Sequence, residues 1–381
     1  MRRDLALIYS EVPAATAAVF TQNDLVAEPV KLTRKHLQDL TAQIIVCNAG
    51  NANACTGEQG AQGAIAMAEQ AAKQLNIPVS NVVVASTGVI GEPFPTEEIV
   101  KGIEENIPKL SKKNTAGSFA ANAILTTDTF AKEGFLEFEA GGYNLNMAGI
   151  AKGSGMIHPN MATMLGFIVT DANVEKKLLQ QITRECVNKT FNMITVDGDT
   201  STNDMVVVMA NGMAENECID SVDHPAYEVF KNKLLEMMLH LAKLIVSDGE
   251  GASKFVEYSV ENALSYDDAA RIAKSIASSN LVKTAMFGRD PNWGRIVCAA
   301  GNAKAGFVYE KADLYMGAPN EEVPVLIQGT PQNFNRNALK KGLRESHISV
   351  KLVLNTGNES AKAWGSDLTT DYVLFNSVYT T

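Results

Sequence analysis

A threonine at the entrance to an apolar segment is the residue whose position offers the most distinctive chemistry. The sequence KGSGMIHPNMATML leads a glycine-rich loop into Ala162 and Thr163, and an apolar run follows at once. If the chain breaks before Thr163, the new α-amine, with a reference pKa of ~7.7–8.0, can serve as general base for the adjacent hydroxyl. Gly153 and Gly155 would permit the strained loop that such a cleavage needs. The competing interpretation is a threonine placed there for its β-propensity alone.

A short turn after another apolar run provides groups that could stabilise an oxyanion. Ser86, Thr87 and Gly88 directly follow the apolar residues 82–85. At the end of a strand, such a turn presents backbone N–H groups and a hydroxyl outward, which is the arrangement that an oxyanion hole requires. On its own the signal is weak, and a plain turn is the simpler interpretation.

Carboxylates gather in the segment TVDGDTSTND, where Asp197, Asp199 and Asp204 lie among several hydroxyl side chains. This spacing is similar to that of a divalent-cation loop, but no bidentate glutamate follows where an EF-hand would need one. We therefore expect a network of Asx and Ser/Thr turns that shapes the floor of the active site. A metal-dependent enzyme built on these three aspartates is the least favoured alternative.

Other polar segments give weaker signals. Glu250 follows the end of an expected long helix, where its carboxylate can hold a substrate amine, and the turn GRDPNWGR at 288–295 is a candidate for the wall of the same cleft. His158 precedes a proline and has no evident acid partner, so we expect it to have a structural role and not to belong to a catalytic triad. The tail from Asn376 to Thr381 would by itself be expected to fray.

The alternation of strand and helix patterns along the chain predicts a mixed α/β protein. Apolar runs bounded by turn residues predict strands, and amphipathic stretches predict helices, with Thr96 and Asn173 as capping residues. We place a boundary at about residue 278, which separates a catalytic core, 1–278, from a C-terminal α/β unit, 279–381. The expected strands are 44–46, 82–85, 164–170 and 205–209, with a hairpin over 135–150, and the expected helices are 59–75, 173–188, 225–246 and 267–279.

Composition places the chain among soluble globular proteins and limits its partners. The 381 residues are 46% hydrophobic and 20% charged, and the formal net charge is -10. Because no long Lys/Arg run is present, nucleic acid is not an expected partner, and no apolar stretch reaches the length of a membrane span. Five cysteines without a C-x-x-C motif favour a reduced, cytoplasmic protein. The N-terminus is expected to form an early strand and not a signal peptide.

Taken together, these segments resemble those of one known family. The strings KGSGMIHPNMATML and ITVDGDTSTNDM, with NACTGEQG, STGVIGE, DGEGASK, DPNWGR and a C-terminal AWGSDLTTDYV, occur here in the order that the ornithine acetyltransferases have them. This is the arginine-biosynthesis family also called bifunctional glutamate N-acetyltransferase, and the resemblance covers nearly the whole chain. The Met-Ala-Thr-Met-Leu segment closely resembles the family's cleavage segment.

The resemblance implies a precursor that cuts itself between Ala162 and Thr163. The products would be an α chain, 1–162, and a β chain, 163–381, and two of each would form a heterotetramer. The implied fold has stacked sheets flanked by helices, like N-terminal-nucleophile hydrolases in outline but with its own connectivity. The implied reaction moves acetyl from N2-acetylornithine to glutamate through an acetyl-threonyl intermediate, giving ornithine and N-acetylglutamate without a metal or cofactor. Whether acetyl-CoA is a second donor is left open.

The resemblance also implies roles for individual residues. Thr163 would be the nucleophile, and Thr87 and Gly88 would form the oxyanion hole. The C-terminal tail would then be ordered over the site, against the expectation from its position alone. The positions implied to bind substrate are Thr126, Lys152, Thr163, Glu250, Asn376 and Thr381.

Two alternatives and one departure from the family accompany this interpretation. An autocleaving amidase or aminopeptidase of similar architecture would pass the acyl group to water, and a non-catalytic binding protein would keep the fold without the chemistry. The Ala162–Thr163 pair and Lys152 argue against the second alternative. Family members usually carry a further segment ahead of the strand LALIYSE, whereas Met1 lies almost at that strand here, so we expect a sheet edge to be exposed.

Overall fold

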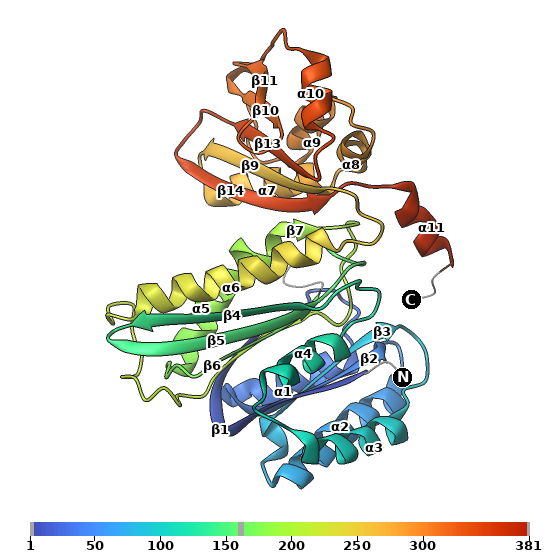
Figure 1. Cartoon of the computed structure of the whole chain (residues 1–381), viewed down its shortest axis with the longest axis vertical. Helices are drawn as coiled ribbons and strands as arrows, with labels where there is room; N and C mark the ends of the chain where they lie inside the picture. The colour runs from blue at the N-terminus through green and yellow to red at the C-terminus, as the bar shows by residue number, and fades with distance from the viewer. Residues whose placement is uncertain (1–3, 159–163, 379–381) are drawn as a thin grey trace.

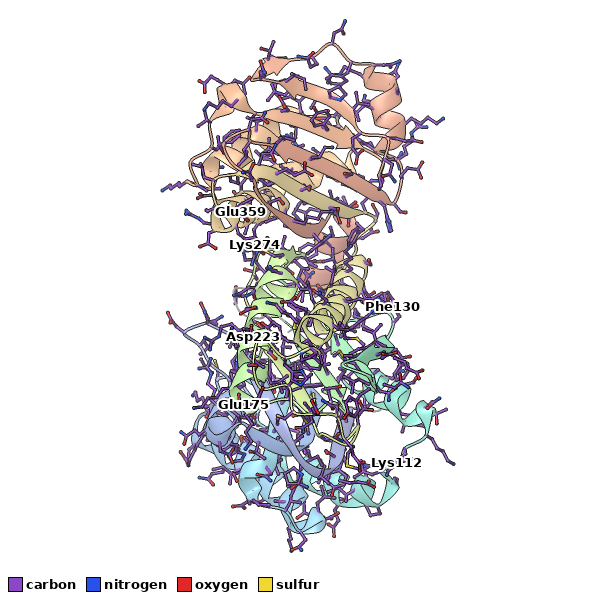
Figure 2. The ribbon with its side chains drawn as sticks, turned by 90° about the vertical axis from the view of Figure 1, so that its left-hand side faces the viewer. Lys112, Phe130, Glu175, Asp223, Lys274 and Glu359 are labelled. Carbon is purple, nitrogen blue, oxygen red and sulfur yellow. The ribbon has the colours of Figure 1, made fainter. Side chains whose placement is uncertain are left out.

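The polypeptide folds into two mixed β-sheets that are flanked by helices, which confirms the predicted α/β class (Figure 1). The computed structural model describes residues 4–158 and 164–378. Within these ranges each sheet has seven strands. The two sheets follow one another along the long axis of the molecule, with a layer of two helices between them (Figures 1 and 2).

Some strands of the first sheet are apolar and buried along most of their length, whereas others expose alternate residues. Its strands are β1 (Leu5–Phe20), β2 (Thr41–Asn51), β3 (Val82–Val89), β4 (Lys132–Ala140), β5 (Tyr143–Lys152), β6 (Leu165–Thr170) and β8 (Met205–Ala210). Their order is β3-β2-β1-β8-β6-β5-β4. Every side chain of β8, MVVVMA, is buried, as are those of β2 from Thr41 to Asn48. Such continuous apolar runs are typical of doubly covered strands, and the predicted strands and hairpin are confirmed.

Helices supply the covering layers. They are α1 (Glu28–His36), α2 (Gly57–Leu75), α3 (Thr96–Asn106), α4 (Asn114–Ala123), α5 (Lys176–Lys189) and α6 (Tyr227–Ser247). Met205 and Val207 of β8 join a core with α1 and α4, whereas the alternate residues Val206 and Val208 join the core that contains α5 and α6. A third core joins α2 and α3 to β2 and β3. No helix of the described ranges is long and apolar enough to cross a membrane.

The second sheet lies beyond α5 and α6 (Figure 2). Its strands, in spatial order, are β12 (Thr330–Pro331), β11 (Val323–Ile327), β10 (Asp313–Gly317), β13 (His347–Val353), β9 (Phe255–Ala263), β14 (Glu359–Ser366) and β7 (Ile194–Thr195). The helices of this part are α7 (Tyr266–Ser278), α8 (Asn280–Phe287), α9 (Trp293–Asn302) and α10 (Arg336–Gly342). The sheet takes strands from both sides of residue 278, and the division of the chain there stays a prediction.

Two expected helix caps differ by a residue or two. α5 begins at Lys176, and its N-cap is Glu175, whose carboxylate accepts a hydrogen bond from the Leu178 N–H. The predicted cap Asn173 is engaged elsewhere, since its N–H donates to the side-chain oxygen of Asn216. α3 begins at Thr96 itself, after Pro95. At α5 the contact of Asn173 with Asn216 leaves the cap to Glu175, whereas α3 has no side-chain cap and begins one residue earlier than expected.

The N-terminal half of β1 is paired on one side only. Leu5–Tyr9 pair with β2, whereas Ala15–Phe20 pair with β8. Among the described residues, no strand pairs with the second edge of Leu5–Tyr9. This half of β1 is therefore a sheet edge within the described ranges, and its link to a shorter N-terminus stays a prediction.

Strand register brings several strand ends to one place. Lys152, the last residue of β5, pairs with Leu165, the first residue of β6, and Leu165 also pairs with Met205 at the start of β8. The C-terminal helix α11 (Thr370–Val378) extends from the second sheet toward this junction (Figure 1). The fold thereby collects residues from distant parts of the sequence around one point.

Candidate active site

A cavity of about 240 Å³ lies at this junction of strand ends. Met164, at the entrance to β6, lines its wall. The predicted residues Ala162, Thr163 and Thr381 lie outside the described residues. The other predicted site residues all line the cavity, namely Thr87, Gly88, Thr126, Lys152, Glu250 and Asn376.

The end of β3 lies beside the cavity, and it includes Thr87 and Gly88, which pair with β2 and do not form the turn expected after the strand. Thr87 Oγ1 accepts a hydrogen bond of 3.3 Å from Lys152 Nζ. Gly88 has a φ of 134°, and a Cβ at this position would lie 2.2 Å from the carbonyl carbon of Gly50 in β2. Only glycine accommodates both this backbone conformation and the close approach of the two strands. Thr87 and Gly88 are thus held against β2 beside the cavity, and their role as an oxyanion hole stays a prediction.

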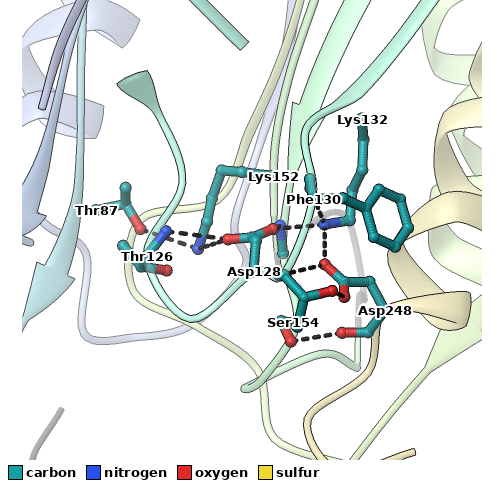
Figure 3. Close-up of polar contacts among 10 residues, drawn as sticks. Thr87, Thr126, Asp128, Phe130, Lys132, Lys152, Ser154 and Asp248 are labelled. Carbon is teal, nitrogen blue, oxygen red and sulfur yellow. Dashed lines mark hydrogen bonds and ion pairs between the residues drawn. The ribbon is translucent and has the colours of Figure 1, made fainter. Parts of the chain in front are cut away.

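Lys152 provides the positive charge of the cavity. Its residue is 8% exposed, and Nζ lies 4.0 Å from Asp128 Oδ2. Burial alone would raise the pKa of Asp128, but the charges of Lys152 and Lys132, with hydrogen bonds from Lys132 and the Gly153 N–H, lower it to about 2. Asp128 is therefore ionised at neutral pH, and it gives the Lys152 ammonium a fixed counter-charge (Figure 3).

A second lysine connects Asp128 to Asp248, as Figure 3 shows. Lys132 Nζ lies 2.7 Å from Asp128 Oδ1 and 2.6 Å from Asp248 Oδ2. The Lys132 and Asp128 side chains are fully buried, and that of Asp248 is 3% exposed. The Lys132 ammonium also lies 4.9 Å from the ring centroid of Phe130. Sequence reasoning assigned no role to these three charged residues.

Glu250 provides a negative charge in the same cavity. Its residue is 8% exposed, and its N–H donates to the Ser154 carbonyl over 3.0 Å. Glu250 Oε2 accepts a hydrogen bond of 2.9 Å from Asn376 Nδ2. Asn376 and Tyr372 belong to α11 and both line the cavity. The described part of the tail is therefore helical and contributes to the site, as the resemblance implied.

The acidic turn after β7 forms the expected hydrogen-bond network. The Asp197 carboxylate accepts hydrogen bonds from the N–H groups of Met156 at 2.7 Å, Ile157 at 2.9 Å and Asp199 at 3.1 Å. Burial raises the pKa of Asp197, and these N–H groups oppose the shift. In the described ranges, no group of three or more His, Cys, Asp or Glu side chains is arranged to hold a metal ion.

Asp204 brings a buried carboxyl group to the cavity wall. The residue is 2% exposed, and within the described part of the chain its Oδ2 has no hydrogen-bond partner. Burial raises the pKa of Asp204 well above its ordinary value, although the Ser201 side chain, the Lys152 charge and the Met164 N–H favour ionisation. Burial thus favours the neutral form of this carboxyl group, and in that form it can donate a hydrogen bond.

His158 has the structural contacts that were expected of it. Its Nδ1 lies 3.0 Å from Thr195 Oγ1, and its carbonyl accepts a hydrogen bond of 3.0 Å from Thr200 Oγ1. Burial, followed by repulsion from Lys274, lowers the pKa of His158 to about 4. The imidazole is therefore neutral at neutral pH, and it joins the loop before β6 to the turn after β7.

The turn at 288–295 does not contribute to the cavity, which corrects the expectation from sequence. Its residues connect α8 to α9, and among the described residues that line the cavity none comes from this turn. Arg295 Nη1 donates to the Leu281 carbonyl over 2.8 Å, so its guanidinium holds the two helices together. The Arg295 side chain of this segment therefore stabilises the junction between α8 and α9.

The arrangement suits a small ligand that carries both charges. Lys152 can bind a carboxylate and Glu250 an ammonium group, and charge-assisted hydrogen bonds of this kind are strong. The Thr87–Gly88 segment of β3 has groups that can stabilise an oxyanion. Together these groups fit a reaction at the carbonyl carbon of an acylated amino acid.

Comparisons with known proteins agree on one family. The model of the ArgJ family matches residues 1–381. The "arginine biosynthesis bifunctional protein ArgJ" of Caldanaerobacter subterraneus subsp. tengcongensis is 48% identical over 380 residues, which cover 100% of this chain and 94% of the relative. The protein of the same name from Listeria monocytogenes is 48% identical over 381 residues, with the same coverage. A crystal structure of the corresponding Bacillus halodurans protein has 45% identity and a TM-score of 0.54, and covers 57% of this chain and 100% of that chain.

Proposed function

The chain belongs to the ArgJ family, and on this premise we propose that it is a glutamate N-acetyltransferase of arginine biosynthesis. It transfers the acetyl group of N2-acetylornithine to glutamate and releases ornithine and N-acetylglutamate. The observation that carries this proposal is the presence of Lys152 and Glu250 in the lining of one cavity of about 240 Å³, together with Thr87 and Gly88. A diamino acid with a carboxylate and a free side-chain ammonium matches both charges.

The first half-reaction forms an acetyl-threonyl enzyme. Thr163 Oγ attacks the acetyl carbonyl carbon while its α-amine takes the hydroxyl proton. Thr87 and Gly88 stabilise the negative charge that develops on the carbonyl oxygen. The C–N bond then breaks, and the departing α-amine of ornithine takes the proton from the Thr163 ammonium.

The second half-reaction reverses these steps with glutamate. Its α-amine attacks the acetyl ester on Thr163, and the ester C–O bond breaks. The proton lost by the amine returns to Thr163 Oγ, which restores the free hydroxyl. Because the threonine itself carries the acetyl group between the two amino acids, we propose that the reaction needs no metal or cofactor.

The free α-amine of Thr163 requires cleavage of the Ala162–Thr163 bond, which we propose is autocatalytic. The matched Bacillus halodurans chain is covered completely yet corresponds to 57% of this chain, which is the fraction that residues 163–381 make up. This agreement supports a break near residue 163. We further propose that two α and two β chains assemble in the cytoplasm into a heterotetramer, which native mass measurement tests.

Intact-mass measurement and activity of the Thr163→Ala variant test the proposal together. We expect the wild type to yield two chains, the larger beginning with Thr163. We expect the variant to remain one chain of 40.9 kDa without transferase activity. An unbroken wild-type chain, with activity that survives Thr163→Ala, would overturn the proposal. Acetate release in place of N-acetylglutamate would favour an amidase.

Acetyl-CoA is proposed as a second acetyl donor because the relatives are named bifunctional. The test is formation of N-acetylglutamate from acetyl-CoA and glutamate when N2-acetylornithine is absent. If N-acetylglutamate forms from acetyl-CoA at the same rate with and without the enzyme, acetyl-CoA is not a donor. The enzyme would then catalyse only the transfer from N2-acetylornithine. Full activity in the presence of a chelator is expected for both donors.

A further inference from the structure

We infer that Asp128, Lys132 and Asp248 are positioning residues that fix the separation between the Lys152 ammonium and the Glu250 carboxylate. This separation sets the length of the diamino acid that the site accepts. The inference rests on the proposed function, because the two charges must bind the same substrate. Asp128, Lys132 and Asp248 are called the buried triad below.

Asp128 connects the triad to the Lys152 side of the cavity (Figure 3). Its Oδ1 accepts a hydrogen bond of 2.7 Å from the Gly153 N–H, which holds the backbone directly after Lys152. Its Oδ2 faces the Lys152 ammonium at 4.0 Å and accepts a hydrogen bond of 3.0 Å from the Thr126 N–H. One carboxylate thus orients the Lys152 side chain, the backbone behind it and a further residue of the cavity wall.

Asp248 connects the triad to the Glu250 side. Its carboxylate accepts hydrogen bonds from the Thr129 N–H and hydroxyl as well as from Lys132. Its backbone carbonyl accepts a hydrogen bond of 2.5 Å from Ser154 Oγ, and the Ser154 carbonyl accepts one of 3.0 Å from the Glu250 N–H. Asp248 and Ser154 therefore hold the segment that carries Glu250.

Lys132 closes the connection between the two sides. Its ammonium lies between the two carboxylates at 2.7 Å and 2.6 Å, and its side chain is fully buried. Burying three charges is costly, and apolar side chains of similar volume would often be at least as stable in such a place. Three apolar side chains could not form hydrogen bonds with the segments that carry Lys152 and Glu250. The triad is therefore best explained by the geometry that it imposes on the cavity.

A fixed separation between two charges discriminates substrates by chain length. N2-acetyllysine is one methylene longer than N2-acetylornithine, and a single methylene changes discrimination by about 10- to 200-fold in a well-defined site. If the triad holds the two charges apart at a set distance, weakening it lets the longer substrate fit. A purely stabilising role would lower activity toward both substrates alike and leave their ratio unchanged.

The test measures kcat/KM for N2-acetylornithine and N2-acetyllysine with the cleaved wild type and two variants. Asp248→Asn removes one charge of the triad, and Ser154→Ala removes only the hydroxyl that joins Ser154 to the Asp248 carbonyl. We expect the preference for the ornithine substrate to fall about 10-fold in Asp248→Asn and in the same direction in Ser154→Ala. Lys231→Met is the matched control, because it removes a 2.6 Å ion pair with Glu185 that lies far from the cavity lining.

Each outcome decides the inference. A ratio that falls in the variants and not in Lys231→Met supports it. A wild-type ratio retained in both folded variants overturns it, as does a wild type that does not distinguish the two substrates. If Asp248→Asn does not fold, the Ser154→Ala ratio decides alone. A wild type that transfers acetyl from neither substrate instead contradicts the proposed function.

Discussion

Gly155 passes so closely beneath Glu250 that a Cβ at residue 155 would lie 2.3 Å from the Glu250 carboxylate carbon. The Glu250 N–H is meanwhile bound to the carbonyl of Ser154, the residue before Gly155. The glycine-rich loop before the expected cleavage segment therefore determines where the anionic group of the cavity lies. The backbone of Gly155 is not in the left-handed region, so a side chain at this position would be opposed by contact with the Glu250 carboxylate and not by backbone strain.

Gly155→Ala is expected to displace the Glu250 carboxylate without disturbing the fold. Loss of one charge-assisted hydrogen bond to the substrate ammonium corresponds to about a 10- to 100-fold fall in kcat/KM. Steady-state kinetics with N2-acetylornithine measure it. The control is Gly117→Ala, since a Cβ there meets no atom within 4 Å. Unchanged kcat/KM in Gly155→Ala would show that Glu250 does not bind the substrate.

Gly88→Ala is expected to remove oxyanion stabilisation by forcing β3 away from β2. The added Cβ would lie 2.2 Å from the Gly50 backbone, and backbone cannot move aside as a flexible side chain can. Loss of one oxyanion donor lowers kcat by about 10²–10³-fold. Gly91→Ala is the matched control because Gly91 also has a positive φ but has open space around it. Equal kcat values for the two variants would exclude a role for Gly88.

Asp204→Asn is expected to stabilise the protein at neutral and alkaline pH. The folded-state pKa of Asp204 is raised by burial, so the stability that its protonated form provides is complete below the unfolded pKa and is lost as pH rises. Asparagine stays neutral throughout. The difference in free energy of unfolding between variant and wild type should therefore grow from pH 4 to pH 8, by at most about 1.4 kcal/mol per pH unit. Thermal unfolding across this range measures it, and a constant difference would contradict a protonated Asp204.

The fold follows closely from local patterns in the sequence. The run MVVVMA predicts a buried strand, and the Gly141-Gly142 pair predicts the turn of the β4–β5 hairpin, because both signals depend on neighbouring residues only. The N-cap of α5 was predicted at Asn173 and lies at Glu175. Asn173 does not cap the helix because its N–H and its side chain are hydrogen-bonded to Asn216, which lies 43 residues further along the chain.

The buried triad could not be predicted from sequence, for a physical reason. Asp128 and Lys132 are four residues apart, a spacing that usually indicates a solvated ion pair on a helix surface. Their burial depends on Asp248, which is 116 residues from Lys132, and on the packing of α6 against β4. Thr87, Gly88 and Glu250 gave weak signals of their own, whereas Thr126 and Asn376 were assigned to the site only through the resemblance.

Asn376→Ala tests whether the C-terminal helix contributes to substrate binding. Asn376 Nδ2 donates to Glu250 Oε2 over 2.9 Å, so its removal leaves a largely buried carboxylate with one partner fewer. The cost of such a loss is about 1–3 kcal/mol, which corresponds to roughly a 5- to 150-fold change. Because α11 buries none of its described side chains, this cost is expected in the KM for N2-acetylornithine and not in the thermal midpoint. Ser377→Ala is the control, since among the described residues the Ser377 hydroxyl donates to the Leu374 carbonyl within the same helix. A KM that rises equally in both variants would mean that the helix acts through its own stability and not through the contact between Asn376 and Glu250.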